Sequence, residues 1–72
     1  MFKSNSPAYI RAVDEKMNLE QRTEKLDTFI KEVKSSNNPD IDATDLELLE
    51  EQLHYMRGYL RVLNIRISRV TS

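Results

Sequence analysis

The sequence predicts an all-α protein built around an antiparallel helical hairpin, and three observations support this fold class. One Gly and two Pro among 72 residues leave few of the turns that an all-β fold needs. Charged residues make up 32% of the chain and are rich in Glu, Lys and Arg, which is typical of helical proteins. Apolar residues from Leu46 to Val70 also recur at alternating spacings of three and four, the pattern of one face of a long helix.

Local signals place the ends of the helical segments. Ser6 and Pro7 predict a helix start, with Ser at the N-cap and Pro at the first helical position. Thr44 and Glu47 have the spacing of a capping box at the start of a second helix. The expected boundaries, all within a single domain, are a polar leader at 1–6, a helical segment at 7–34, a turn at 35–44 and a long helix at 45–70.

The long helix carries two apolar lines. The first line needs a partner helix along its whole length, and it consists of Leu46, Leu49, Leu53, Met56, Leu60, Leu63, Ile67 and Val70. The second line is Leu48, Tyr55, Tyr59 and Val62, roughly 125° around the helix axis. A surface helix needs only one apolar stripe, so two lines predict contact with more than one neighbour.

The first helical segment also divides its apolar residues between two sides. Ile10, Val13 and Met17 cluster on one side of an ideal helix. The other set lies nearly opposite and comprises Leu19, Thr23, Leu26, Phe29, Ile30 and Val33. Either the chain breaks near Asn18, where Gln21 three positions later could help to cap a new helix, or one helix serves two partners.

Chain length makes self-association the expected source of stability. Small scaffolds usually need disulfides, a metal or oligomerisation. The chain has no Cys and a single His, His54, so disulfides and thiolate metal sites are excluded and a reducing cytoplasm is expected. No apolar run is long enough for a transmembrane span or a signal peptide. The formal charge of −1 argues against DNA or a membrane as partner.

The sequence shows no catalytic machinery, so we expect a binding protein rather than an enzyme. It has no glycine-rich phosphate loop and no Cys or Ser placed beside a His as an activated nucleophile. A hairpin of this size offers no deep cleft in which carboxylate pKa values could be raised, so a deep pocket would have to form between subunits. No metal and no cofactor are expected.

Groups that could bind an anionic ring ligand are present nonetheless. They are the aromatic side chains of Tyr9, Tyr55 and Tyr59 and the cations of Arg11, Lys16, Lys25, Arg57, Arg61 and Arg66. Residues 52–72 hold four Arg and no acid, which suits either the negative end of a helix dipole or an anionic ligand. The alternative interpretation of the whole set is interface tyrosines and arginines that lie along apolar surface.

Two stretches resemble a family of phage proteins, the cyclic-oligonucleotide sponges directed against CBASS immunity, to which the second anti-CBASS protein belongs. The resemblance covers about residues 7–68, and it depends on the order and spacing of short segments rather than on any one of them. The first half contributes Pro7-Ala8-Tyr9-Ile10-Arg11-Ala12-Val13-Asp14-Glu15-Lys16, Leu19 and Lys25-Leu26-Asp27-Thr28-Phe29-Ile30. The second half contributes Leu49, Gln52-Leu53, Met56, Tyr59, Leu63 and Arg66-Ile67.

The resemblance implies a short N-terminal helix, two longer antiparallel helices and a compact homohexamer. It implies pockets between protomers that hold cyclic di- or trinucleotides without cleaving them, in the cytoplasm of the infected host cell. Tyr9 is the match for the family's base-stacking Tyr and Lys25 for its phosphate-binding Lys. Arg66 is the match for an Arg of a second, trinucleotide-type pocket. Arg11 and Asp27 stand where the family has small polar residues, a departure that affects the trinucleotide-type pocket more than the dinucleotide pocket. Arg11, one of the cations named above, is also a candidate ligand contact.

Overall fold

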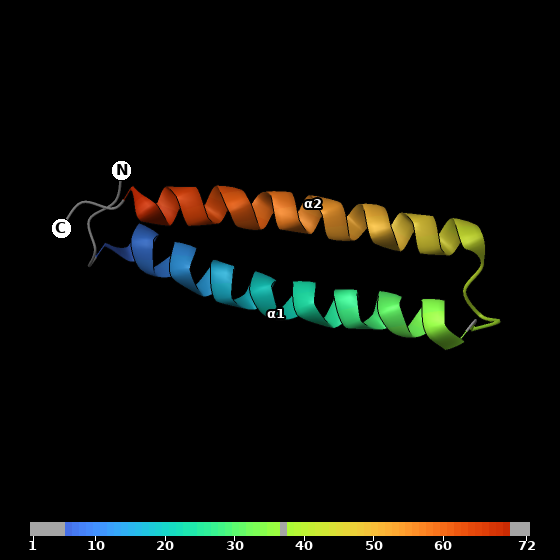
Figure 1. Ribbon diagram of the computed structural model, residues 1–72. Helices are drawn as coiled ribbons and strands as arrows, with labels where there is room; N and C mark the ends of the chain where they lie inside the picture. The colour runs from blue at the N-terminus through green and yellow to red at the C-terminus, as the bar shows by residue number, and fades with distance from the viewer. Residues whose placement is uncertain (1–5, 37, 70–72) are drawn as a thin grey trace.

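The computed structural model describes residues 6–36 and 38–69, and these form two antiparallel α-helices (Figure 1). Helix α1 spans Pro7–Ser36 and helix α2 spans Ala43–Ser68. The start of α1 lies beside the end of α2, and the turn closes the other end of a molecule that measures 51 × 15 × 14 Å. The predicted all-α hairpin is confirmed, and no strand occurs among the described residues.

Both helices begin with a capped turn, although the second cap differs from the prediction. Ser6 caps α1 as expected, since its Oγ accepts a hydrogen bond of 3.1 Å from the backbone N–H of Tyr9. At α2 the N-cap is Asp42: the Asp45 N–H donates to Asp42 Oδ1 at 2.7 Å, and the Asp42 N–H donates to Asp45 Oδ2 at 3.4 Å. Thr44 at the N-cap was therefore a wrong prediction, because an ionised Asp two residues earlier accepts the amide hydrogen bond and the helix starts before Thr44.

The connection between the helices is shorter than predicted. Helix α1 continues through Ser36, whose hydroxyl donates to the Glu32 carbonyl at 2.7 Å. In the turn, the Asp40 N–H donates to Asn38 Oδ1 at 2.9 Å, and the Ile41 N–H donates to the Asn38 carbonyl at 3.2 Å. Asn side chains favour such turns, and the Pro that follows Asn38 disfavours continuation of the helix.

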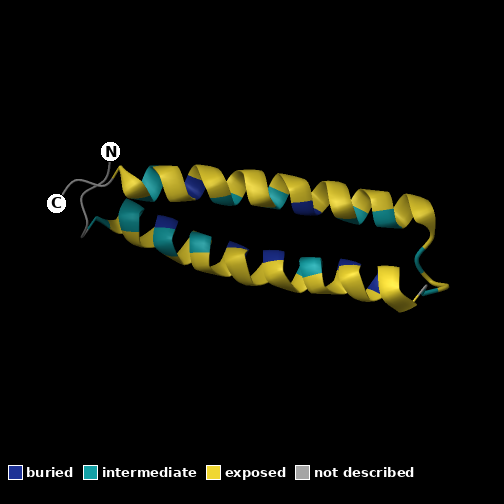
Figure 2. Ribbon diagram, in the orientation of Figure 1, coloured by how far each residue is buried: buried dark blue, intermediate teal, exposed yellow. Residues whose placement is uncertain are grey.

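The core is a single seam between the inner faces of the two helices (Figure 2). Every described member of the predicted first line on α2 is buried or half-buried, with Leu53 and Leu63 the most buried; Val70 lies outside the described residues. The buried polar residue Thr23 donates its hydroxyl to the Leu19 carbonyl at 2.6 Å, so it enters the core with its hydrogen bond satisfied. The buried residues are Ala12, Leu19, Thr23, Ile30, Val33, Leu53 and Leu63.

Helix α1 is continuous through Asn18, so the separate short N-terminal helix that the resemblance implied is joined to the hairpin. Neither Gly nor Pro occurs between Ala8 and Asn38, and nothing therefore interrupts the backbone hydrogen bonding. Of the two predicted apolar sides, the one that starts at Leu19 faces α2. Ile10 and Met17 remain 52% and 56% exposed.

The hairpin leaves much apolar surface uncovered. The radius of gyration is 15.9 Å, whereas a compact domain of this length would have about 11 Å. All the members of the second line on α2 are exposed, as Tyr55 illustrates at 66%. Within the described parts of the chain, neither helix is both long and apolar enough to cross a lipid bilayer.

Candidate functional site

Three of the four candidate ligand-binding residues lie at the same end of the hairpin. Tyr9 is in the first turn of α1, Arg11 follows it, and Arg66 is in the last turn of α2, beside the start of α1 (Figure 1). Tyr9 and Arg66 are half-buried, and Arg11 is exposed. The fourth residue, Lys25, is exposed and lies near the middle of α1.

One protomer does not bring Tyr9 and Lys25 together. Sixteen positions separate them on a continuous helix, which corresponds to about 24 Å along its axis. They also point to nearly opposite sides, about 160° apart at about 100° per residue. A ligand that contacts both residue types must therefore reach Tyr9 of one copy and Lys25 of another.

Lys25 lines an open depression on the outer side of α1. The depression has a volume of about 360 Å³ and is lined by Glu24, Lys25, Thr28, Phe29 and Glu32. Among the described residues, no carboxylate forms an ion pair with Lys25. The ammonium group thus remains available to an anion from outside the protomer, and Phe29, 39% exposed, supplies an aromatic surface nearby.

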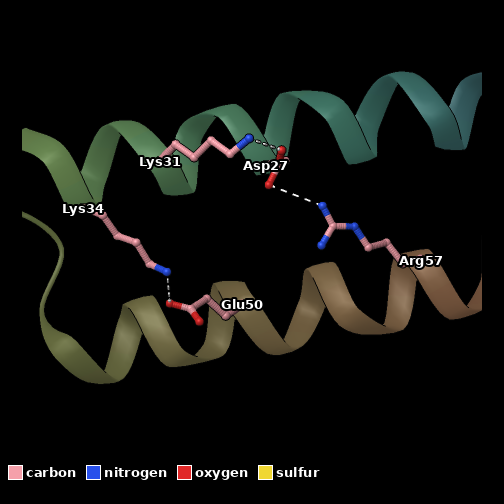
Figure 3. Close-up of polar contacts among 5 residues, drawn as sticks. All are labelled: Asp27, Lys31, Lys34, Glu50 and Arg57. Carbon is pink, nitrogen blue, oxygen red and sulfur yellow. Dashed lines mark ion pairs between the residues drawn. The ribbon is translucent and has the colours of Figure 1, made fainter.

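A flank of the hairpin is held by ion pairs, which we call the polar flank (Figure 3). Lys34 Nζ lies 3.2 Å from Glu50 Oε1, and Arg57 Nη2 lies 3.4 Å from Asp27 Oδ1, so both pairs join α1 to α2. Lys31 Nζ lies 3.0 Å from the other oxygen of Asp27. The hydrogen bond from Lys31, aided by the charges of Lys31 and Arg57, holds the pKa of Asp27 below its ordinary value of 3.8.

The polar flank removes Arg57 from the set of unpaired phosphate donors. Its guanidinium is paired with Asp27, a residue at which the resemblance marked a change from a small polar side chain. Lys16 is similarly engaged, since its Nζ lies 3.6 Å from Glu20 Oε1. An anion approaching this flank would also meet the carboxylate of Asp27, which opposes its binding.

Helix α2 carries an apolar groove on the second line of side chains. Its volume is about 650 Å³, and it is lined by Leu48, Glu51, Gln52, Tyr55, Met56 and Tyr59. Tyr59 is fixed against the other helix because its hydroxyl donates a hydrogen bond to Glu15 of α1. The Tyr55 hydroxyl donates to Glu51 at 3.4 Å, and its ring meets that of His54 edge-on, 5.5 Å between centroids. The groove combines flat aromatic faces with hydrogen-bonding rims.

Several residues of these surfaces were not found from the sequence. Glu15 and Glu50 both form bonds to a residue on the other helix, and no sequence signal identifies such partners before the register of the hairpin is known. Phe29 was expected on the core side of α1, whereas it borders the depression of Lys25. Its position about 100° from Ile30 on the helix could have indicated this placement.

The described residues carry several polar groups that could contact a ligand. No group of three His, Cys, Asp or Glu side chains within residues 6–36 and 38–69 is placed to hold a metal ion. The polar groups that could contact a ligand are cations, tyrosines and carboxylates on open surfaces. Such groups can stack on rings and pair with anions.

The model of one family, described as Sequestin, matches residues 6–69, from the N-cap of α1 to the C-cap of α2. Neither the curated proteins nor the solved structures include a significant match. The match spans both helices and every candidate ligand-binding residue described above. The chain belongs to the Sequestin family.

Proposed function

We propose that this protein sequesters cyclic di- or trinucleotide immune signals in pockets between its protomers, without cleaving them. By lowering the free concentration of the signal in the host cytoplasm, it would prevent CBASS from activating its effector. The family name is consistent with sequestration of a ligand. The resemblance to phage anti-CBASS sponges supplies the ligand class and the homohexameric assembly.

One observation carries the proposal: the stacking group of Tyr9 and the phosphate-binding group of Lys25 lie far apart in a single protomer. They are about 24 Å apart along α1, and the depression around Lys25 is open rather than enclosed. The described residues of one protomer therefore do not form a pocket that contains both groups, while the exposed apolar residues favour assembly. Assembly can place Tyr9 of one copy opposite Lys25 of a neighbour.

The residues would divide the recognition of a cyclic dinucleotide. Stacking of a base on the ring of Tyr9 would contribute on the order of 1–3 kcal/mol. Lys25 would donate a charge-assisted hydrogen bond to a phosphate, which offsets the cost of removing that phosphate from water. Arg11 and Arg66, which share one end of the hairpin, are the candidates for additional phosphate contacts with a trinucleotide.

Calorimetric titration with a panel of cyclic di- and trinucleotides tests this function. We expect saturable binding of at least one cyclic compound at a fixed ratio of ligand to protomer, and weaker binding of the linear dinucleotide with the same bases. After denaturation of the protein, the bound compound should be recovered intact. Heat signals that are flat for the entire panel contradict the proposed ligand class, and linear product that accumulates with time contradicts sequestration.

A second candidate function is a helical module that binds or inhibits another protein, with no small ligand. The apolar groove on α2 favours this candidate, because Leu48 and Tyr55 are 58% and 66% exposed. The same titration separates the two functions, since a module of this kind gives no heat with any nucleotide. Glu51 is the one charged residue among the side chains that line this groove.

A further inference from the structure

The outer face of α2, nearly opposite the buried seam, carries a line of residues with heptad-like spacing. It shares Leu48, Tyr55 and Val62 with the second line defined above. We call it the outer seam, and its spacing alternates between three and four: Leu48, Glu51, Tyr55, Gly58, Val62 and Ile65. All six residues are exposed, including Val62 at 43% and Ile65 at 45%. Such spacing favours packing against another helix along the line.

Gly58 lies at the middle of the outer seam, in the interior of a helix where Gly is unfavourable. A Cβ atom at this position would meet no atom within 4 Å, so no contact in the protomer requires a residue without a side chain. Small residues allow two helix backbones to approach closely. Gly58 is therefore explained best by another helix that crosses α2 at this point.

The distribution of charge along α2 indicates the direction of that helix. Residues 40–51 hold six acids and no base, whereas residues 52–72 hold four Arg and no acid. Two parallel copies of α2 would place like charges together. Two antiparallel copies place the acidic half of each helix against the basic half of the other, which favours association and fixes its orientation.

We infer that two copies of this chain pack through the outer seams of their α2 helices, antiparallel and crossing at Gly58. The contact is isologous, with a two-fold axis through the Gly58 region. Tyr55 of each copy lies beside Val62 of the other, and Glu51 of each lies near Arg66 of the other. This inference concerns assembly alone and holds whether or not a nucleotide is the ligand.

Cysteine cross-linking tests the axis and the direction together, because the chain has no native Cys. Under mild oxidation, Gly58→Cys should form a disulfide-linked dimer, since the two copies of this position meet at the axis. Leu48→Cys alone should not, because its two copies lie about 30 Å apart in the antiparallel pair. A mixture of Leu48→Cys and Arg69→Cys chains should give the linked heterodimer. A linked Leu48→Cys homodimer, or no link at Gly58→Cys, overturns the inference.

A pair of substitutions at one position provides an independent test. Gly58→Ala and Gly58→Leu both improve helix propensity, and Gly58 is exposed with room for a Cβ atom, so the larger side chain of Leu matters chiefly where a crossing helix must accommodate it. In sedimentation equilibrium without nucleotide, Gly58→Leu should raise the dissociation constant of self-association at least ten-fold above that of Gly58→Ala. Equal constants for the two variants overturn the inference. Ligand binding is not measured in either test, so failure here and failure of the proposed function remain separate results.

Discussion

Arg57 of α2 lies 3.4 Å from Asp27 of α1, and this ion pair shares its carboxylate with Lys31 (Figure 3). The pair links the middle of the two helices on the polar flank. The sequence comparison marked Asp27 only as an altered position beside a ligand pocket. In the structure, Asp27 has a different role. It connects the helices electrostatically, and the connection depends on pH.

The pKa of Asp27 should be measurably below 3.8, its ordinary value. A carboxyl whose pKa is lowered on folding stabilises the protein above the ordinary pKa, and that contribution disappears as pH falls through the lowered one. Carbon-detected NMR titration of the side-chain carboxyl would give the midpoint. Lys31→Ala should raise the midpoint more than Arg57→Ala does, because the hydrogen bond from Lys31 is the larger cause. A midpoint at or above 3.8 in the wild type would contradict the ion pairing.

Truncation of the buried seam should be costly. Leu63 is fully buried and Leu53 nearly so, and we expect Leu63→Ala or Leu53→Ala to lower the free energy of unfolding by roughly 2–5 kcal/mol. Urea unfolding followed by circular dichroism measures the change. Gln21→Ala is the control, because Gln21 is an exposed polar residue of α1 and its truncation should cost little. Comparable losses for Leu63→Ala and Gln21→Ala would show that the inner face is misassigned.

Substitutions at the start of α2 distinguish the two possible caps. Asp42→Ala removes the acceptor for the Asp45 N–H and should cost about 1 kcal/mol of stability. Thr44→Ala should be close to neutral, since Thr44 lies inside the helix. If thermal unfolding shows the larger loss for Thr44→Ala, the capping box predicted from the sequence is the one that forms in solution.

Tyr9→Ala and Lys25→Ala should each weaken binding of a cyclic dinucleotide at least ten-fold while leaving the oligomer intact. The ring of Tyr9 supplies stacking and the ammonium of Lys25 supplies a phosphate contact. Calorimetry gives the affinity and light scattering the assembly state. Binding of the wild type should weaken with added salt, as expected for a partly exposed ionic contact.

Mixing these two variants tests whether the pocket lies between protomers. In a mixed oligomer, some interfaces pair an intact Tyr9 from one chain with an intact Lys25 from its neighbour, so part of the binding capacity should return. A pocket formed within one chain gives no recovery on mixing. The double variant Tyr9→Ala and Lys25→Ala, mixed with either single variant, is the matched control and should recover nothing.

Assembly should be evident at micromolar concentration. We expect light scattering to give about 51 kDa, six times the chain mass of 8.5 kDa, and no folded monomer. The exposed apolar residues and the extended shape of the hairpin are the physical reason. A monodisperse monomer that melts cooperatively would contradict both the hexamer and the proposed pockets between protomers.

The sequence was most informative where periodicity alone determines the structure. The alternating line from Leu46 to Ile67 predicted the inner face of α2, and the long helix predicted a hairpin partner. The cap was less predictable, because Asp42 and Thr44 both precede a helical pattern and only the energetics of competing turns selects between them. Periodicity could not predict whether the side with Ile10 and Met17 or the side with Leu19 faces α2, because both sides are apolar.

The candidate site was less predictable than the fold for a specific reason. Tyr9 and Lys25 were selected by resemblance, and helix geometry now shows that one chain holds them apart. Bonds between helices, such as that from Tyr59 to Glu15, depend on a register that neither segment specifies alone. Contacts between copies involve the outer seam, which could be identified only once the hairpin showed which side of α2 stays exposed.

The short turn between α1 and α2 sets an order of events during folding. Val33, Ile41 and Leu46 line the same small cavity beside the turn, so these contacts close only a short loop of chain. Contacts between the start of α1 and the end of α2 join segments far apart in sequence and can form only after the helices have zipped along their length. A hairpin that grows from one end in this way has low contact order, which favours folding in microseconds to milliseconds. Newly made chains would therefore sample the hairpin rapidly without accumulating it. The encounter between copies, which depends on concentration, would stabilise the hairpin and set the pace at which working protein accumulates.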